Sequence, residues 1–160
     1  MLRWLWLSGA VIALDQITKL MIAGTLELHQ RITVIPGFFN LTLAYNEGAA
    51  FSFLSDAGGW QRWFFTALAI VVAAILVAWL KRLTPADKGS AIALALIIGG
   101  ALGNLIDRLL YGHVIDFIQW YYKSYYWPSF NIADSAITVG ATLLILVSLF
   151  DQRDSGSHHD

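Results

Sequence analysis

Residues 90–110 read SAIALALIIGGALGNLIDRLL, and this run carries no charged residue before Asp107. A helix of about 20 residues, rising ~1.5 Å per residue, is long enough to cross the ~30 Å hydrocarbon layer of a bilayer. A run of this length and polarity is typical of a transmembrane helix. It decides the fold class, because the rest of the chain is patterned in the same way.

Three further apolar runs of similar length flank it, at residues 2–26, 60–80 and 131–150. The chain is 58% hydrophobic and 13% charged, with a mean hydropathy of +0.62, which separates it from ordinary soluble domains. The first run resembles a secretory signal peptide, but Asp15 and Lys19 interrupt it and no soluble domain follows, so we expect it to be retained. The sequence predicts an α-helical membrane protein with four transmembrane helices in one domain, residues 1–160.

The charge pattern predicts the orientation of these helices. Cytoplasmic segments of membrane proteins are enriched in Lys and Arg. The cations near the ends of the runs would all lie on one side of the membrane: Arg3, Lys81, Arg82, Lys88 and Arg153. Both termini are therefore expected in the cytoplasm, and the connections 27–59 and 111–130 are expected to face outward.

The two outward connections differ in character. Between Phe39 and Tyr45, apolar and smaller or polar residues alternate, which is typical of a half-buried strand, so a small β-sheet is expected between the first two helices. Residues 117–130 read FIQWYYKSYYWPSF, and such amphipathic rings favour the headgroup layer of a membrane. Both connections are therefore expected to rest on the outer membrane surface.

Several function classes are disfavoured by what the sequence lacks. The net charge of −1 gives no surface suited to nucleic acid, and the absence of cysteine removes thiol nucleophiles and thiolate metal sites. The chain has no Gly-x-Ser motif and no His-Glu-x-x-His motif, and His29 and His113 do not form a metal site by themselves. No metal, cofactor or nucleic-acid partner is expected.

Polar residues interrupt the first and third runs. Asp15 and Lys19 are four residues apart on one helical face, so they form either a simple ion pair or a pair that orients a substrate or loop. In the third run, small residues favour close helix packing, and an amide could bond across that contact. The residues concerned are Gly99, Gly103, Asn104, Asp107 and Arg108. Separate partners are expected for Asp107 and Arg108, because neighbours on a helix do not face each other.

Asp116 and Asp134 differ from these residues because neither has a Lys or Arg within four residues. Unpaired acids near lipid are costly and are usually functional, although a solvated loop acid and a helix N-cap remain the plain alternatives. Two carboxylates held together away from bulk water share one proton, so one is charged and the other neutral. Such a pair can activate water and polarise a carbonyl group, as in aspartic proteases.

At the motif level the chain resembles the bacterial lipoprotein signal peptidases, known as signal peptidase II. Five stretches carry the resemblance in order: DQITK at 15–19, NEGAAF at 46–51, GGALGNLIDR at 99–108, VIDF at 114–117 and FNIAD at 130–134. The resemblance implies four helices with a periplasmic sheet, called the cradle, and an aromatic flap opposite it. It also implies an aspartyl endopeptidase whose catalytic residues are Asp116 and Asp134.

Further expectations follow from the same resemblance. The substrate would be a prolipoprotein whose lipobox cysteine already carries diacylglycerol, cut on the amino side of that cysteine. The enzyme would be a monomer in the bacterial inner membrane, in contact with lipid, with its site facing the periplasm. Residues expected to support the site or the substrate are Asp15, Lys19, Asn46, Gly99, Asn104, Asp107, Arg108, Asn131 and Ala133. Asn46 and Asn131 could bond the peptide backbone, or could serve only as turn and cap residues.

Two rival interpretations remain open at this point. A presenilin-like or prepilin-peptidase-like aspartyl protease would also use two acids, but the Gly-x-Gly-Asp motif of those families does not occur in this chain. A small transporter would use Asp15, Lys19 and Asp107 as a relay of charges across the membrane. The transporter would not account for the outward strand pattern or for the aromatic connection.

Overall fold

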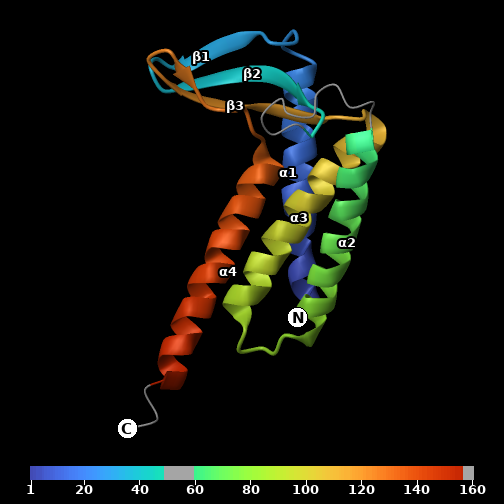
Figure 1. Ribbon diagram of the computed structural model, residues 1–160, viewed down its shortest axis with the longest axis vertical. Coiled ribbons are helices and arrows are strands. Elements are labelled where there is room, and N and C mark those ends of the chain that lie inside the picture. The colour runs from blue at the N-terminus through green and yellow to red at the C-terminus, as the bar shows by residue number, and fades with distance from the viewer. Residues whose placement is uncertain (49–59, 157–160) are drawn as a thin grey trace.

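The computed structural model describes residues 1–48 and 60–156 of the chain. Four long helices follow a short 3₁₀ turn (Leu2–Trp4), and they are α1 (Leu5–Ala23), α2 (Trp60–Arg82), α3 (Lys88–Leu110) and α4 (Ile132–Gly156). Each helix is long and apolar enough to cross a membrane, so the prediction of four transmembrane helices is confirmed. Figure 1 shows the β-sheet across one end of the helices, with the N-terminus and the last turns of α4 at the other end.

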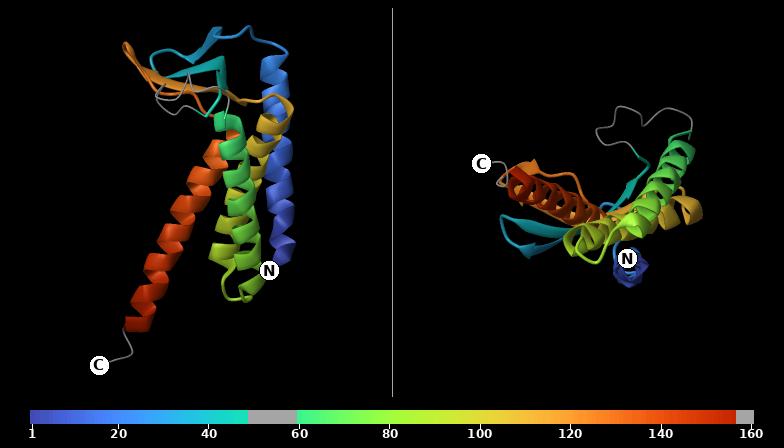
Figure 2. Two further views of the ribbon diagram at one scale, coloured as in Figure 1. Left: turned by 45° about the vertical axis from the view of Figure 1, so that its right-hand side comes forward. Right: turned by 90° about the horizontal axis from the view of Figure 1, so that it is seen from below.

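Helix α3, which contains the run 90–110, is the central helix. It packs against each of the other three helices. In the apolar 18-residue stretch of α3, 61% is buried, against 17–22% in the corresponding stretches of α1, α2 and α4. A view along the helices shows α3 between its neighbours (Figure 2). The outer helices expose many large apolar side chains, as expected of surfaces that face lipid. At the end away from the sheet, Leu80, Ala91, Leu94 and Ile98 form the main buried cluster.

Within the described residues the sheet has four antiparallel strands in the order β1-β2-β3-β4, and the connections 27–59 and 111–130 both contribute to it. The first supplies β1 (Arg31–Ile35) and β2 (Phe39–Asn46), and the second supplies β3 (Val114–Tyr122) and β4 (Tyr125–Tyr126). The aromatic connection, expected as a flap opposite the sheet, is therefore largely part of the same sheet. The sequence did not reveal this, because the pairing of β2 with β3 joins segments about 70 residues apart.

The sheet is fixed to the helices by a small apolar cluster. Leu43 of β2 and Ile115 of β3 are buried against Leu26, just beyond the end of α1, and against the last turn of that helix. β3 itself begins four residues after the end of α3 and is followed by β4 and then by α4. Residues of β3 are thus held at the same depth as the beginning of α4.

Close packing of α1 on α3 depends on Gly99. A methyl group at this position would lie 2.8 Å from Val11 Cβ and 2.9 Å from the Ser8 backbone oxygen, both in α1. We expect Gly99→Ala to lower the free energy of unfolding in detergent by about 1–3 kcal/mol, because the helices would have to separate. Gly9→Ala is the matched control, since a methyl group there has no neighbour within 4 Å among the described residues. Equal stability of the two variants would show that the contact can adjust without cost.

Candidate active site

Asp116 lies in β3 and is almost completely buried, with an exposed fraction of 2%. Its two carboxylate oxygens accept hydrogen bonds from two side-chain amides: Asn131 Nδ2 at 2.8 Å and Asn46 Nδ2 at 3.1 Å. Asn46 ends β2, and its own Oδ1 accepts a bond from the Gly48 backbone N–H at 2.9 Å. The strand pairing of β2 with β3 therefore brings an amide donor directly to a buried acid.

Asp134 lies in the first turn of α4 and is only partly buried. Its backbone N–H donates to Asn131 Oδ1 at 2.8 Å, and its carboxylate accepts the Asn131 backbone N–H at 3.3 Å. These reciprocal bonds form a capping box, with Asn131 at the N-cap and Asp134 three residues later. Asp134 is therefore not the N-cap residue, but it does take part in capping the helix.

Two amides join the carboxylates to each other. Asn131 is fully buried and binds Asp116 through its side chain and Asp134 through its backbone. Asn104 of α3 donates to Asp134 Oδ1 at 2.7 Å, and its Oδ1 accepts from Asn131 Nδ2 at 3.1 Å. The prediction that Asn104 would bond across a helix contact is confirmed. One hydrogen-bonded unit thus holds two acids from different elements.

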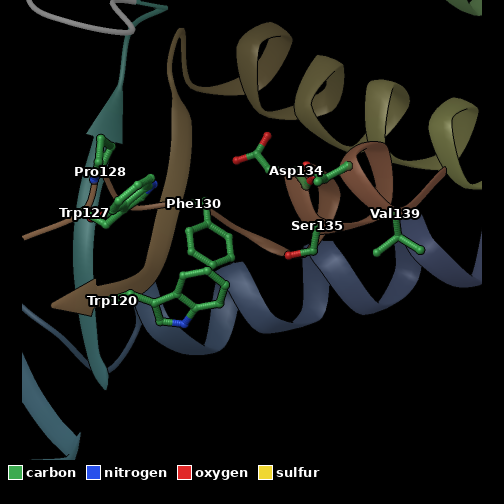
Figure 3. A pocket seen from close by; sticks show the side chains of 9 residues that line it. Trp120, Trp127, Pro128, Phe130, Asp134, Ser135 and Val139 are labelled. Carbon is green, nitrogen blue, oxygen red and sulfur yellow. The ribbon is translucent and has the colours of Figure 1, made fainter. Parts of the chain in front are cut away.

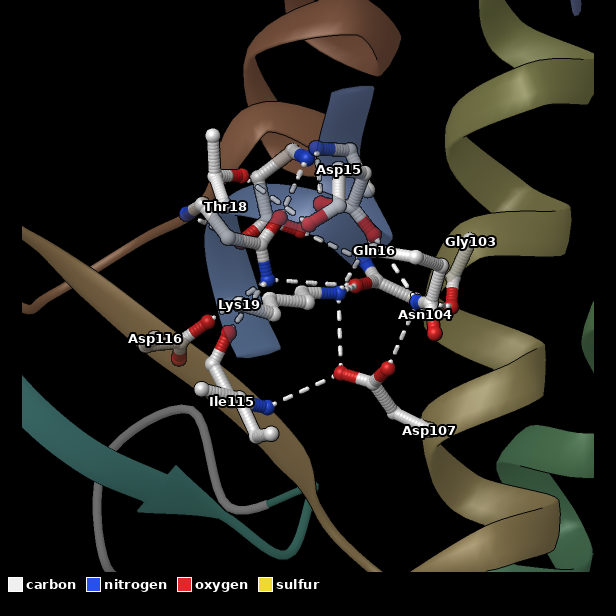
Figure 4. A network of polar contacts seen from close by, with 12 residues as sticks. Asp15, Gln16, Thr18, Lys19, Gly103, Asn104, Asp107, Ile115 and Asp116 are labelled. Atoms are coloured by element: carbon white, nitrogen blue, oxygen red, sulfur yellow. Dashed lines mark hydrogen bonds and ion pairs between the residues drawn. The ribbon is translucent and has the colours of Figure 1, made fainter. Parts of the chain in front are cut away.

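A buried charge cluster lies beside this unit (Figure 4). Lys19 Nζ is 2.7 Å from Asp15 Oδ2 and 2.8 Å from Asp107 Oδ2, and it also donates to Asn104 Oδ1 at 3.1 Å. The exposed fractions of these three charged residues are 0–1%. The expected ion pair between Asp15 and Lys19 is confirmed, but the lysine serves two carboxylates and therefore joins α1 to α3.

The acids of the cluster also position the backbone of neighbouring elements. Asp15 Oδ1 accepts the Ala133 N–H at 2.9 Å, near the N-terminus of α4. Asp107 Oδ2 accepts the Ile115 N–H at 3.0 Å, one residue before Asp116. Gly103 lies against this cluster, since a methyl group there would be 2.8 Å from Asp15 Oδ2. The charge cluster thereby fixes both segments that carry the two site carboxylates.

Arg108 has a different environment from its neighbour Asp107, as expected. Its guanidinium lies over the Phe65 ring of α2 at 5.3 Å from the ring centroid. It interacts electrostatically with Asp134, Asp116 and Asp107. Its buried Nε has no hydrogen-bond partner among the residues that the structure describes. Arg108 thus places a cation near both site carboxylates with donor capacity to spare.

An apolar pocket of about 520 Å³ opens beside Asp134. Figure 3 shows the rings of Trp120, Trp127 and Phe130 on one side and Asp134, with other residues of α4, on the opposite side. Among the described lining residues Asp134 is the one carboxylate, so a mainly apolar surface lies beside an acid. The rest of the lining consists of Pro128, Ser129, Ser135, Thr138 and Val139.

The environment of Asp116 disfavours a negative charge. Burial, and then the charge of nearby Asp134, raise the pKa of the Asp116 carboxyl to about 7, although the amides of Asn46 and Asn131 act in the opposite direction. A carboxyl with this pKa can hold a proton near neutral pH. Together with Asp134 it has the properties of an acid–base pair.

The structure brings together most of the residues selected from the sequence. The exceptions are Gly99, which acts through helix packing, and part of the NEGAAF stretch, since residues 49–51 lie outside the described residues. One contributor was missed: Gln16 Nε2 donates to Asp107 Oδ1 at 2.8 Å and to the Gly103 carbonyl at 3.2 Å. A polar amide inside an apolar run, next to Asp15, was the signal that could have identified it.

The fold and the site define a class: a multi-pass membrane protein in which two carboxylates meet at one end of the helices, beside an apolar pocket. The family described as Signal peptidase (SPase) II matches residues 7–150, and the chain belongs to that family. The earlier assignment from the five motifs is thus confirmed.

Individual relatives agree with the family. The chain is 56% identical over 156 residues to a lipoprotein signal peptidase of Pseudomonas syringae pv. tomato, covering 97% of this chain and 90% of that protein. It is 57% identical over 154 residues to one from Xylella fastidiosa, covering 96% and 92%. A solved bacterial membrane enzyme superimposes with a TM-score of 0.84 at 36% identity, covering 95% of this chain and 90% of that one.

Proposed function

We propose that Asp116 and Asp134 are the catalytic carboxylates of this chain, and that they cut a prolipoprotein on the amino side of its lipid-modified cysteine. The activity follows from the family, because signal peptidase II is an aspartic-type peptidase that removes signal peptides from prolipoproteins. A small transporter and a peptidase of the presenilin type are thereby set aside.

The observation that supports the assignment best is the bonding around Asn131. One fully buried amide residue binds Asp116 through its side chain and Asp134 through its backbone. Carboxylates that interact in a desolvated site share a proton, which is the state an aspartic peptidase requires. The other acids of the region, Asp15 and Asp107, are both paired with Lys19 and so lack that property.

The chemistry consumes one water molecule and proceeds in two steps. The ionised carboxylate removes a proton from water while the water oxygen bonds to the scissile carbonyl carbon, and the neutral carboxyl gives its proton to the carbonyl oxygen. In the second step the carbon–nitrogen bond breaks. The first carboxyl passes its proton to the departing nitrogen, and the second recovers a proton from the new carboxylic acid.

The pocket beside Asp134 provides a surface for the lipid part of the substrate. Its aromatic rings and Val139 of α4 suit acyl chains, and Asp134 in the lining supports a reaction at the edge of the pocket. Arg108 interacts electrostatically with both carboxylates and supplies positive charge beside the reacting groups. Asn131 is fully buried and its amide already binds protein atoms, so its role is to orient the carboxylates.

The site lies at the sheet end of the helices, and this supports a location for the reaction. Cations gather at the other end, and under the positive-inside rule this supports cytoplasmic termini and a site on the periplasmic side of a bacterial inner membrane. A lipid-modified substrate in that membrane would enter from the bilayer itself. One chain contributes every element of the site, so we propose that the monomer is active.

The test is cleavage of a defined substrate by the purified protein in lipid. A prolipoprotein carrying diacylglycerol on its lipobox cysteine is expected to be cut, and mass spectrometry of the products should place that cysteine at the new amino terminus. The same substrate without the lipid should be cut at least about 10-fold more slowly, because the pocket would be left without its apolar ligand. Cleavage at another bond, or equal rates for both substrates, would contradict the proposal.

A further inference from the structure

The two site carboxylates have different surroundings. Asp134 lies in the first turn of α4, where the helix dipole favours an anion, and it is partly exposed to the pocket. Asp116 lies in a β-strand, is 2% exposed, and receives its two side-chain hydrogen bonds from the neutral amides of Asn46 and Asn131. Geometry therefore stabilises a negative charge on Asp134 better than on Asp116.

A chain of hydrogen bonds from Lys19 through Asn104 to Asp134, called the relay below, adds to this difference in how well the two carboxylates bear a negative charge. Lys19 Nζ donates to Asn104 Oδ1 at 3.1 Å, and Asn104 Nδ2 donates to Asp134 Oδ1 at 2.7 Å. A cation bound to the amide oxygen polarises the amide, so that its N–H groups become stronger donors to an anion. Among the described residues, Asn104 makes the shortest hydrogen bond to either site carboxylate.

Other charges near the pair do not cancel the effect. Asp15 and Asp107 are both paired with Lys19. Arg108 interacts more strongly with Asp134 than with Asp116. Among the described residues, α1, α3, β3 and α4 supply these charged groups. Arg108, a cation of α3, therefore favours a negative charge on Asp134, as the relay does.

We infer that Asp134 is the ionised carboxylate that activates water, that Asp116 holds the shared proton, and that Lys19 and Asn104 are positioning residues which enforce this assignment. The inference rests on the proposed catalytic pair. Asp134 would take the proton from water at the pocket edge, and buried Asp116 would protonate the carbonyl oxygen. The pKa of Asp116, raised to about 7 mainly by burial, agrees with a carboxyl that is neutral at rest.

Infrared spectroscopy of the carboxyl groups tests the assignment without using activity. Asp134→Asn leaves only Asp116 to titrate, Asp116→Asn leaves only Asp134, and the double variant supplies the baseline for both difference spectra. We expect the protonated-carboxyl band to persist to higher pH for Asp116 than for Asp134. The reverse order, or equal midpoints, would overturn the inference even if both variants were inactive, whereas an active single variant would overturn the catalytic pair itself.

The relay is tested in the Asp116→Asn background. Adding Asn104→Leu removes the donor to Asp134 but leaves Lys19 its two carboxylate partners. The titration midpoint of Asp134 should rise by about 1–2 pH units, as expected when a charge-assisted hydrogen bond is lost. Asn104→Ser, which keeps a polar group but cannot span the gap, should give a shift in the same direction and covers the case in which the leucine variant does not fold.

Ser8→Ala is the matched control for the relay. It removes a buried hydrogen bond between α1 and α3, from Ser8 Oγ to the Ala95 carbonyl at 2.7 Å, far along the helices from the carboxylates. A purely structural role for Asn104 would predict similar small shifts in both variants. A midpoint that moves equally with Ser8→Ala and Asn104→Leu would therefore remove Lys19 and Asn104 from the assignment.

Discussion

Replacement of either Asp116 or Asp134 by asparagine is expected to lower kcat/KM for a lipid-modified substrate by roughly 10³-fold or more, with little change in stability. Asparagine preserves the size of the side chain, but its amide does not gain or lose a proton in the pH range in which the carboxyl groups titrate. Because the pair acts as a unit, the double variant should be hardly slower than either single variant. Thermal unfolding in detergent confirms that each variant is folded before its activity is compared.

The pH dependence of the wild-type enzyme provides a second measurement of the same pair. If Asp116 and Asp134 are the catalytic pair as proposed, activity requires one proton on the two carboxyls. Since the pKa of Asp116 is raised to about 7, its proton is lost and activity falls as the pH rises through that value. On the acid side, activity falls when the pair binds a second proton. A folded Asp116→Asn or Asp134→Asn variant that cleaves at a near wild-type rate would refute the catalytic assignment.

Lys19→Met is expected to lower the free energy of unfolding by about 3–5 kcal/mol, because removal of one member of a buried ion cluster leaves its partners uncompensated. Asp15 and Asp107 would remain fully buried with only neutral donors. Lys81→Met is the matched control, since Lys81 is exposed at the end of α2 and its loss should cost less than about 0.5 kcal/mol. Similar unfolding curves for the two variants would contradict the prediction.

Exchange of the charges, Asp15→Lys with Lys19→Asp, separates a simple ion pair from the observed arrangement. The exchange keeps the net charge, but a lysine at position 15 cannot accept the Ala133 N–H, and an aspartate at position 19 would face Asp107. We therefore expect the free energy of unfolding of the exchanged variant to stay below that of the wild-type protein. Full recovery would mean that the pair only neutralises itself within α1.

The sequence was sufficient to predict those features that depend on local patterns. Apolar length identified the four helices, and two acids without a cation at helical spacing identified Asp116 and Asp134 as unusual. The shared sheet could not be predicted, because the register of β2 on β3 depends on where the chain returns after two membrane crossings. Asp107 and Asn104 lie three residues apart, so the sequence could place them on one helical face. The ion pair of Asp107 with Lys19 could not be predicted, because these two residues lie 88 positions apart in the chain.

The pocket beside Asp134 has a consequence for kinetics. Its wall includes Thr138 and Val139, which follow Asp134 along α4, a helix with many exposed apolar side chains, as expected of a surface that faces lipid. A substrate anchored in the same bilayer would reach it by diffusion in two dimensions. Its effective concentration is then a mole fraction among lipids rather than an amount per volume of solution. Dilution of the bilayer with inert lipid at constant total substrate should therefore slow turnover, whereas dilution of the vesicles with buffer should not.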